Sequence, residues 1–130
     1  MPGSHHIMKC TAKEFNMLAA QISASLIASL PDDLRSEAEK ILIQTSDHPS
    51  SEQMDGSGDE LLGLYEGIPL SEKSMFSFQE HDRITIFRMP LLDMCSSKRE
   101  LKNEIRLTLI HELGHHFGFS EEELIERGLD

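Results

Sequence analysis

The sequence predicts one α+β domain, in which a small sheet of about three strands packs on an N-terminal helix and a long C-terminal helix. Three observations lead to this fold class. The chain has 130 residues, the usual length of a single domain. Apolar residues recur at helical spacing near both ends of the chain. Three short apolar segments lie between these regions. The predicted order is therefore helix, strand, strand, strand, helix, helix.

The first helix is predicted to begin after Thr11. Thr11 and Glu14 form a T-x-x-E capping box, in which each side chain can satisfy the backbone N–H of the other residue. Apolar residues then recur every three or four positions, which places them on one helical face: Phe15, Leu18, Ala19, Ile22, Leu26 and Leu30. Pro31 ends the helix. We expect this face to pack in the core.

Three strands are expected in the middle of the chain, at 41–45, 61–66 and 83–89. The polar segment 32–40, before the first of them, has room for a short helical turn. Segment 47–60 is rich in Gly, Ser and acidic residues, which is typical of a long loop. The third strand is expected to end at Pro90.

Ser97 is predicted to open the long helix through an S-x-x-E capping box with Glu100. Its apolar residues lie near one face: Leu101, Ile105, Leu109, Leu113 and Phe117. Gly118 is the expected left-handed residue that ends this helix. Ser120 is the expected N-cap of a short terminal helix over 121–127.

The charge balance restricts the partners of this protein. Twelve Lys and Arg against 23 Asp and Glu give a formal net charge of −11. Phosphate groups would be repelled by so acidic a surface, so we expect no nucleic-acid partner and no membrane partner. The apolar runs are also too short to span a bilayer.

We expect residues 1–7, which include His5 and His6, to be the remnant of a cloning scar and tag, and 8–130 to form the single domain. Cys10 and Cys95 do not make a disulfide framework, which favours reduced thiols. The apolar stretch after Lys13 is interrupted by polar residues and is not typical of a signal peptide. We therefore expect a cytoplasmic protein, and a monomer.

One segment carries recognisable chemistry: residues 111–115 read His-Glu-Leu-Gly-His, an HExxH motif. His111 and His115 are four residues apart, so they lie one turn apart and about 40° apart on one helical face. Both imidazoles can therefore bind one metal ion. Glu112 lies about 100° around the helix from His111, where it can reach a water on that ion. The motif predicts two zinc ligands and a general base, Glu112.

A catalytic zinc ion takes three protein ligands and leaves one position to water. Gly118 permits a turn that brings the following chain back toward the motif. Glu121 then completes H-E-x-x-H-x-x-G-x-x-E, and is the predicted third ligand. Glu122 and Glu123 are adjacent competitors. His116 points to another helical face and is expected to flank the site.

Three segments together resemble one known family, that of the small bacterial zincin-like metallopeptidases, or minimal zincins. They are 61–70 (LLGLYEGIPL), 83–92 (RITIFRMPLL) and 111–124 (HELGHHFGFSEEEL). The resemblance implies a compact zincin core with one zinc ion. It also implies peptidase activity, with Glu112 as the base and His111 and His115 as ligands. Glu121 stands where the family usually has Asp.

By the same resemblance, the strand expected at 61–66 would be a sheet edge that pairs with an extended peptide or protein substrate. Leu62, Leu64 and Tyr65 would then contact the substrate. Tyr65 is also the one candidate for stabilising the negatively charged oxygen that develops during hydrolysis.

Three other interpretations compete with a minimal zincin. A regulatory peptidase of the ImmA/IrrE type also carries HExxH on a helix, and would call for a DNA-binding partner or domain. A non-catalytic metal-binding or protein-interaction module would suit so small a chain, which has little material for the walls of a substrate pocket. A structural zinc site is disfavoured by Glu112 and by the shortage of a fourth ligand.

Overall fold

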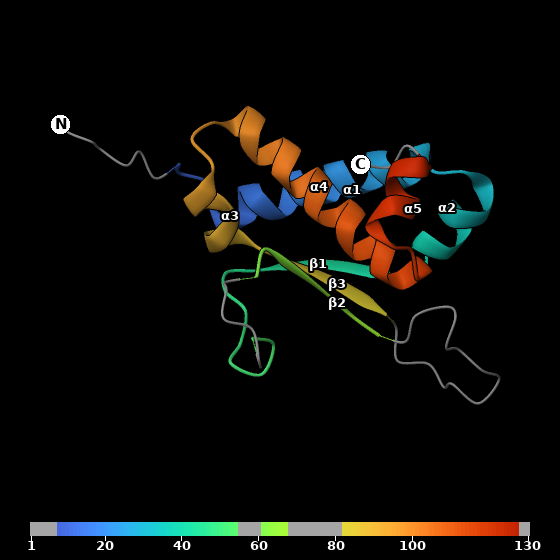
Figure 1. Ribbon diagram of the computed structural model, residues 1–130. Coiled ribbons are helices and arrows are strands. Elements are labelled where there is room, and N and C mark those ends of the chain that lie inside the picture. Colours follow the sequence, from blue (N-terminus) through green and yellow to red (C-terminus); the bar gives the residue numbers. More distant parts are fainter. Residues whose placement is uncertain (1–7, 55–60, 68–81, 128–130) are drawn as a thin grey trace.

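The computed structural model describes residues 8–54, 61–67 and 82–127, apart from the side chain of Glu121. Figure 1 shows the helices and strands within these ranges. In chain order they are α1 (Ala12–Ser29), α2 (Asp32–Ala38), β1 (Leu42–Ser46), β2 (Gly63–Glu66), β3 (Arg83–Phe87), α3 (Arg88–Met94), α4 (Lys98–Phe117) and α5 (Glu121–Glu126). The predicted α+β class is confirmed.

The three strands of the described chain form one sheet in the order β1-β3-β2. β1 runs parallel to β3, with Ile43 opposite Ile84. β2 runs antiparallel to β3, with Tyr65 opposite the same Ile84. Strand β2 is therefore an edge of this sheet, as the family resemblance implied for segment 61–66.

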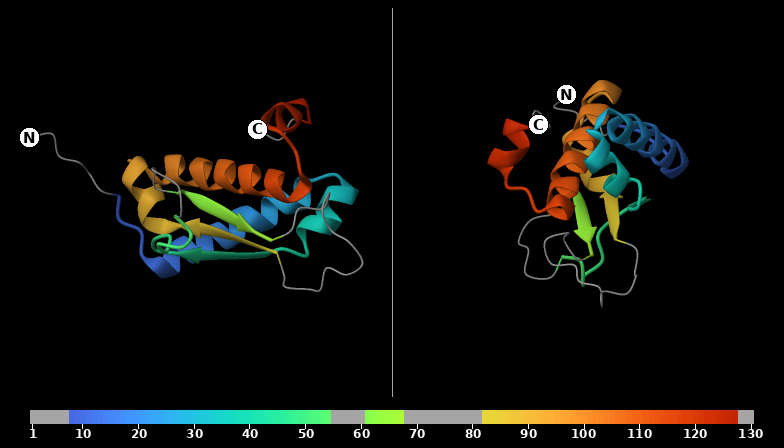
Figure 2. Two further views of the ribbon diagram at one scale, coloured as in Figure 1. Left: turned by 60° about the horizontal axis from the view of Figure 1, so that its bottom comes forward. Right: turned by 90° about the vertical axis from the view of Figure 1, so that its right-hand side faces the viewer.

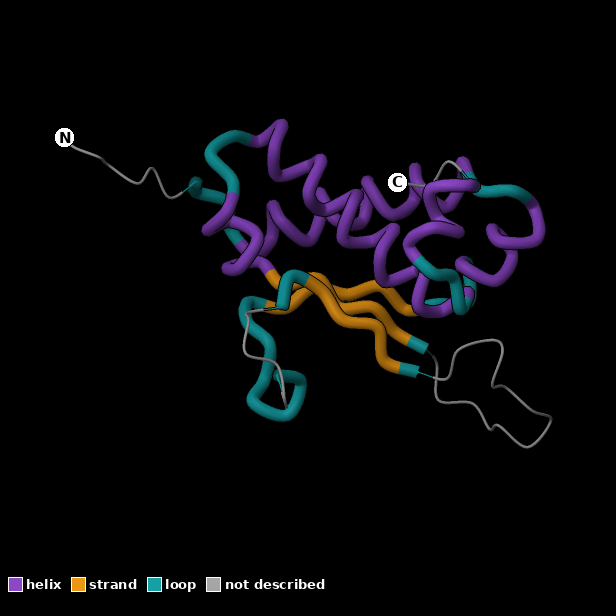
Figure 3. The backbone as a smooth tube through the Cα atoms, in the orientation of Figure 1, coloured by secondary structure: helices purple, strands orange, loops and turns teal. Residues whose placement is uncertain are grey.

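Helices α1 and α4 lie on the same face of the sheet, with the strands forming the other layer (Figure 3). Ile84 and Ile86 of β3 are completely buried beneath the helices. Ile105 and Leu109 of α4 are also fully buried in the same core. The two helical stripes predicted from sequence thus meet over the central strand. Figure 2 shows that the chain turns back after α4, so that α5 lies over the C-terminal part of α4.

The ends of the two long helices are determined locally, as predicted. Thr11 Oγ1 accepts a hydrogen bond from Glu14 N at 3.1 Å, and Ser97 Oγ accepts one from Glu100 N at 3.1 Å. Gly118 has φ 75° and ψ 25°, the left-handed conformation that ends α4. None of the described helices is long and apolar enough to cross a membrane.

The prediction of one strand over 83–89 is wrong at its C-terminal end, because β3 ends at Phe87 and helix α3 follows at once. Pro90 is the third residue of α3. A proline in the first helical turn loses no intrahelical hydrogen bond, so it is compatible with a helix start as well as a strand end. Arg88 secures this junction by donating from Nε to Asp47 Oδ1 at 2.7 Å.

Smaller corrections concern the other strands and the turn before them. The segment predicted as a helical turn is the seven-residue helix α2. β1 is displaced by one residue from the predicted 41–45, and β2 begins at Gly63 rather than at residue 61. Part of the predicted loop, residues 55–60, lies outside the described chain.

Gly63 allows the edge strand β2 to approach α4 closely. A Cβ atom at Gly63 would lie 2.6 Å from Thr108 Cγ2 and 3.3 Å from Ile86 Cδ1. Contacts below 3.0 Å essentially never occur for a real Cβ atom. Strand β2 can therefore lie beside α4 only because this position has no side chain.

We predict that Gly63→Ala destabilises the fold by about 1–3 kcal/mol, the usual cost of overpacking a well-packed site. Urea unfolding would measure the change. Thr108→Ser removes the methyl group that the new Cβ would strike, while its hydroxyl can keep the 2.7 Å hydrogen bond to Glu104 O.

The double variant Gly63→Ala/Thr108→Ser should therefore recover most of the stability lost by Gly63→Ala. If the two substitutions are simply additive, the close approach of β2 and α4 is not what requires glycine at this position.

Candidate metal centre

The C-terminal half of α4 presents both histidines of the HExxH motif to solvent. The ring centroids of His111 and His115 are 4.9 Å apart. Both residues are exposed, because the helical turn places them on one outward face. Two exposed imidazoles at this separation can converge on a single metal ion.

Glu112, between these histidines in sequence, is buried, with its side chain 8% exposed. Its Oε1 accepts a hydrogen bond from the backbone N–H of Tyr65 at 2.9 Å. The same oxygen lies 3.4 Å from His115 Nδ1. Burial raises the pKa of the Glu112 carboxyl, and the neighbouring His115 and His111 and the Tyr65 N–H oppose this rise.

The orientation of His115 suits zinc. Its Nδ1 faces the Glu112 carboxylate, so Nε2, on the far side of the ring, is directed away from that carboxylate. Imidazole that binds zinc through one nitrogen commonly places the other against a carboxylate or carbonyl, which determines the tautomer. The described part of the site thus fits two of the three protein ligands of a catalytic zinc ion.

Tyr65 joins β2 to a buried polar network beside the motif. Its hydroxyl donates to Asp82 Oδ2 at 2.9 Å and lies 3.1 Å from His116 Nδ1. His116 Nδ1 in turn lies 3.0 Å from Asp82 Oδ2, and both side chains are less than 7% exposed. Burial and the Asp82 carboxylate raise the pKa of the Tyr65 hydroxyl.

This network places His116 where the sequence expected it, beside the motif and facing another way than His111 and His115. Asp82 and the backbone N–H of Tyr65 were missed by the sequence analysis. Neither belongs to a motif, since both come from the sheet and meet α4 only after folding. The only signal was indirect, namely the implied position of 61–66 as an edge strand near the active-site helix.

The edge strand directs only alternate backbone groups outward. Phe87 N donates to Leu62 O at 3.0 Å, so Leu62 and Leu64 direct their backbone groups toward β3. Gly63 and Tyr65 direct theirs toward the outer side, where the Tyr65 N–H meets Glu112. Leu62, Leu64 and Tyr65 are each half-buried. Their contact with substrate stays a prediction.

The third predicted ligand lies at the start of α5. Glu121 is the first residue of this helix, but its side chain lies outside the described part of the structure. Among the described side chains, no three His, Cys, Asp or Glu residues gather in a metal-binding group. The site would therefore need a ligand from beyond the described set, and the sequence nominates Glu121.

One of the competing acids has another role. Glu123 forms a capping box with Ser120, accepting from Ser120 N at 3.3 Å while Ser120 Oγ accepts from Glu123 N at 3.2 Å. A carboxylate used in this way supports the helix start. Glu122 is exposed. Glu122 does not gather with His111 and His115 in a metal-binding group of described side chains, so Glu121 stays the predicted third ligand.

Gly114, inside the motif, seats α5 against α4. A Cβ atom at Gly114 would lie 2.9 Å from Leu124 Cδ1, and Leu124 is buried. Phe119 N also donates to Gly114 O at 2.9 Å as the chain leaves α4. The helix that carries Glu121 is thus anchored on the HExxH motif itself.

An HExxH helix that packs on a small sheet beside an edge strand is the arrangement of a zincin-type metallopeptidase. The profile of the zincin-like metallopeptidase family matches residues 38–129 of this chain. The match covers well over half of the sequence, and the protein belongs to that family.

A solved structure has a similar fold, that of a conserved hypothetical protein from Thermus thermophilus. It has a TM-score of 0.51 and 22% sequence identity, over 85% of this chain and 97% of the other. At this identity the likeness concerns the fold alone. No curated protein gives a significant match.

We predict that His111→Ala and His115→Ala each abolish stoichiometric zinc binding, because the remaining ligands cannot hold the ion tightly. Elemental analysis after dialysis would measure the zinc content. The protein should lack residues 1–7, since His5 and His6 can also bind zinc. His48→Ala is the matched control and should keep the wild-type content. Wild-type zinc in either motif variant would show that the ligands are elsewhere.

The third ligand is tested separately. Glu121→Ala should weaken zinc affinity at least about tenfold, because even residues that only support a ligand are worth about 10–100-fold. Glu122→Ala should change it little. For Glu123 the control is Glu123→Gln, because glutamine can keep the capping box. Competition with a chromophoric chelator would measure the affinities. A large loss in Glu122→Ala alone would transfer the assignment to Glu122.

Proposed function

We propose that the protein is a zinc-dependent metallopeptidase that hydrolyses peptide bonds, with Glu112 as general base. One observation carries the proposal. The Glu112 carboxylate is buried and held by the Tyr65 N–H at 2.9 Å, directly beside two adjacent exposed imidazoles. A structural zinc site would have no use for such a carboxylate.

His111, His115 and Glu121 would hold the ion. When bound, zinc supplies Lewis-acid chemistry, lowering the pKa of a bound water toward about 7 and polarising the scissile carbonyl.

Glu112 performs the proton transfers of hydrolysis. It takes one proton from the attacking water, whose oxygen bonds to the carbonyl carbon, and delivers it to the leaving nitrogen as the C–N bond breaks. Burial favours the protonated form of this carboxyl, which must exist between the two transfers. The Tyr65 N–H orients the carboxylate by holding Oε1.

The substrate in this proposal is an extended peptide or protein segment that pairs with the outer side of β2. The backbone N–H and C=O of Gly63 and the C=O of Tyr65 point to that side. The half-buried Leu62, Leu64 and Tyr65 would contact the substrate's side chains. The Tyr65 hydroxyl is hydrogen-bonded to Asp82, so its proposed part is to hold the strand.

We also propose that the enzyme acts as a monomer in the cytoplasm. One observation supports the compartment, and a second bears on the partners. Both cysteines are free thiols, as is usual in a reducing compartment. The formal net charge of −11 disfavours an anionic membrane surface or a nucleic acid as partner.

We predict that Glu112→Gln keeps the fold and the zinc but loses at least about a hundredfold in peptide hydrolysis, the lower end for loss of a general base. Glutamine can still accept the Tyr65 N–H bond, so orientation should survive. A peptide library read by mass spectrometry would report cleavage by the zinc-loaded protein. Glu126→Gln, an exposed acid on α5, is the control.

Equal activity of wild type and Glu112→Gln would exclude Glu112 as the base. Zinc binding by the wild type without any cleavage would favour a non-catalytic metal-binding module. Cleavage restricted to one regulatory protein would favour the ImmA/IrrE-type interpretation.

A further inference from the structure

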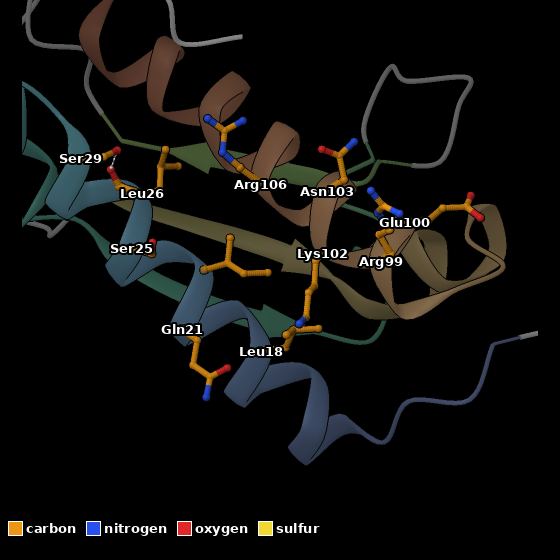
Figure 4. A pocket seen from close by; sticks show the side chains of 11 residues that line it. Leu18, Gln21, Ser25, Leu26, Ser29, Arg99, Glu100, Lys102, Asn103 and Arg106 are labelled. Atoms are coloured by element: carbon orange, nitrogen blue, oxygen red, sulfur yellow. Dashed lines mark hydrogen bonds between the residues drawn. The ribbon is translucent and has the colours of Figure 1, made fainter.

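A groove of about 850 Å³ runs between α1 and the N-terminal half of α4. Figure 4 shows the side chains that line it from both helices. The groove uses α4 residues 99–106, whereas the metal-binding motif occupies 111–115. It therefore has no part in the proposed hydrolysis.

The α4 wall of the groove carries three cations, together with the acid Glu100 and the amide Asn103. Arg99, Lys102 and Arg106 line it at positions i, i+3 and i+7, which places them within about 60° of one another around the helix. All three are exposed. Within the described chain, none of them forms an ion pair.

This row of cations lies in a protein that is acidic overall. The formal net charge is −11, and some other cations have acidic partners close by. Arg88 Nε lies 2.7 Å from Asp47 Oδ1, and Arg83 Nε lies 3.3 Å from Glu66 Oε1. Three neighbouring cations on one helical face are therefore a local concentration of positive charge in a strongly acidic chain.

The α1 wall is neutral and polar. Gln21, Ser25 and Ser29 line the groove at i, i+4 and i+8, and all three are exposed. Ser29 Oγ donates to Leu26 O at 2.7 Å (Figure 4). Gln21 and Ser25 make no hydrogen bond with another described side chain, so both can reach a ligand.

The floor of the groove is apolar. Leu18, Ile22 and Leu26 form a row on α1 below the polar wall. Ile22 is only half-buried and offers apolar surface to an occupant. The groove thus has an apolar floor. Its α4 wall carries three cations, and its α1 wall carries amide and hydroxyl groups.

We propose that this groove docks an acidic amphipathic helix of a partner protein. A third helix fits a groove formed by two helices, and places its own apolar stripe on the floor. The lining row from Leu18 to Ser29 is about 16 Å long at 1.5 Å per residue. Such a row accommodates roughly three helical turns, enough for carboxylates opposite Arg99, Lys102 and Arg106.

Charge favours this occupant over the alternatives. A second copy of the chain also has a formal net charge of −11, so association of two copies is opposed at long range. An anionic membrane would meet the same repulsion over its whole surface. One short acidic helix can align with the cationic wall while the rest of its protein stays distant.

A designed peptide tests the proposal on the full chain. The probe is an 18-residue fluorescein-labelled helix with leucine at helical spacing, glutamate on both sides of that stripe and alanine elsewhere. We expect saturable binding in fluorescence anisotropy, weakened by added salt. Reversing three cations should weaken it by about tenfold or more, from three exposed ion pairs of modest strength.

The matched control separates the groove from overall charge. Arg99→Glu/Lys102→Glu/Arg106→Glu and Lys9→Glu/Lys13→Glu/Lys40→Glu each take the formal net charge from −11 to −17. Only the first triple variant alters the groove, so only it should lose binding. Circular dichroism checks both folds, and Arg99→Gln/Lys102→Gln/Arg106→Gln replaces the reversal if that variant unfolds.

Four results would overturn the proposal. The first is no binding of the probe at about 1 mM, and the second is an equal loss of peptide affinity in the two triple variants. The third is equal binding of a peptide that has lysine in place of glutamate. The fourth is dimerisation of the protein that the groove variant abolishes. Groove-dependent binding to phosphatidylglycerol vesicles without binding of the peptide would likewise replace the helix by a lipid surface.

Discussion

The hydrogen bond from the Tyr65 N–H to the Glu112 carboxylate is the interaction that joins the sheet to the chemistry of this protein. It requires the edge strand and the HExxH helix to lie at one defined separation. Gly63 makes that separation possible, because any side chain there would strike Thr108. The hydroxyl of Tyr65, hydrogen-bonded to Asp82 and close to His116, then holds the strand in place.

The removal of Glu112 from solvent at this contact changes the pKa of its carboxyl group. An exposed glutamate would stay ionised and mobile, whereas Glu112 is buried against a backbone N–H and a histidine ring. Its raised pKa follows from that burial. The adjacent His111 and His115 remain exposed, so about one turn of helix presents one buried carboxyl group and two outward imidazoles. Helix α4 also carries the cationic groove wall, half its length away.

Local sequence signals were sufficient wherever neighbours along the chain decide the outcome. Thr11, Ser97 and Ser120 cap their helices, and Gly118 ends α4, because capping involves only three or four consecutive residues. The HExxH spacing likewise follows from helical periodicity. The prediction was wrong where two local structures were both possible. Pro90 is compatible with a strand end and with a first helical turn, and only the packing of the folded chain selected helix α3.

By itself, then, the sequence determined the α+β class, the capped helices and the adjacency of His111, Glu112 and His115. Only the tertiary structure decided the strand order, the burial of Glu112 and its contact with Tyr65. It also brought Asp82 to His116, and α1 beside the cations of α4. These contacts join residues far apart in the sequence, such as Tyr65 and Glu112, which are 47 positions apart. Such pairs have no shared periodicity, because their proximity results from the packing of whole elements.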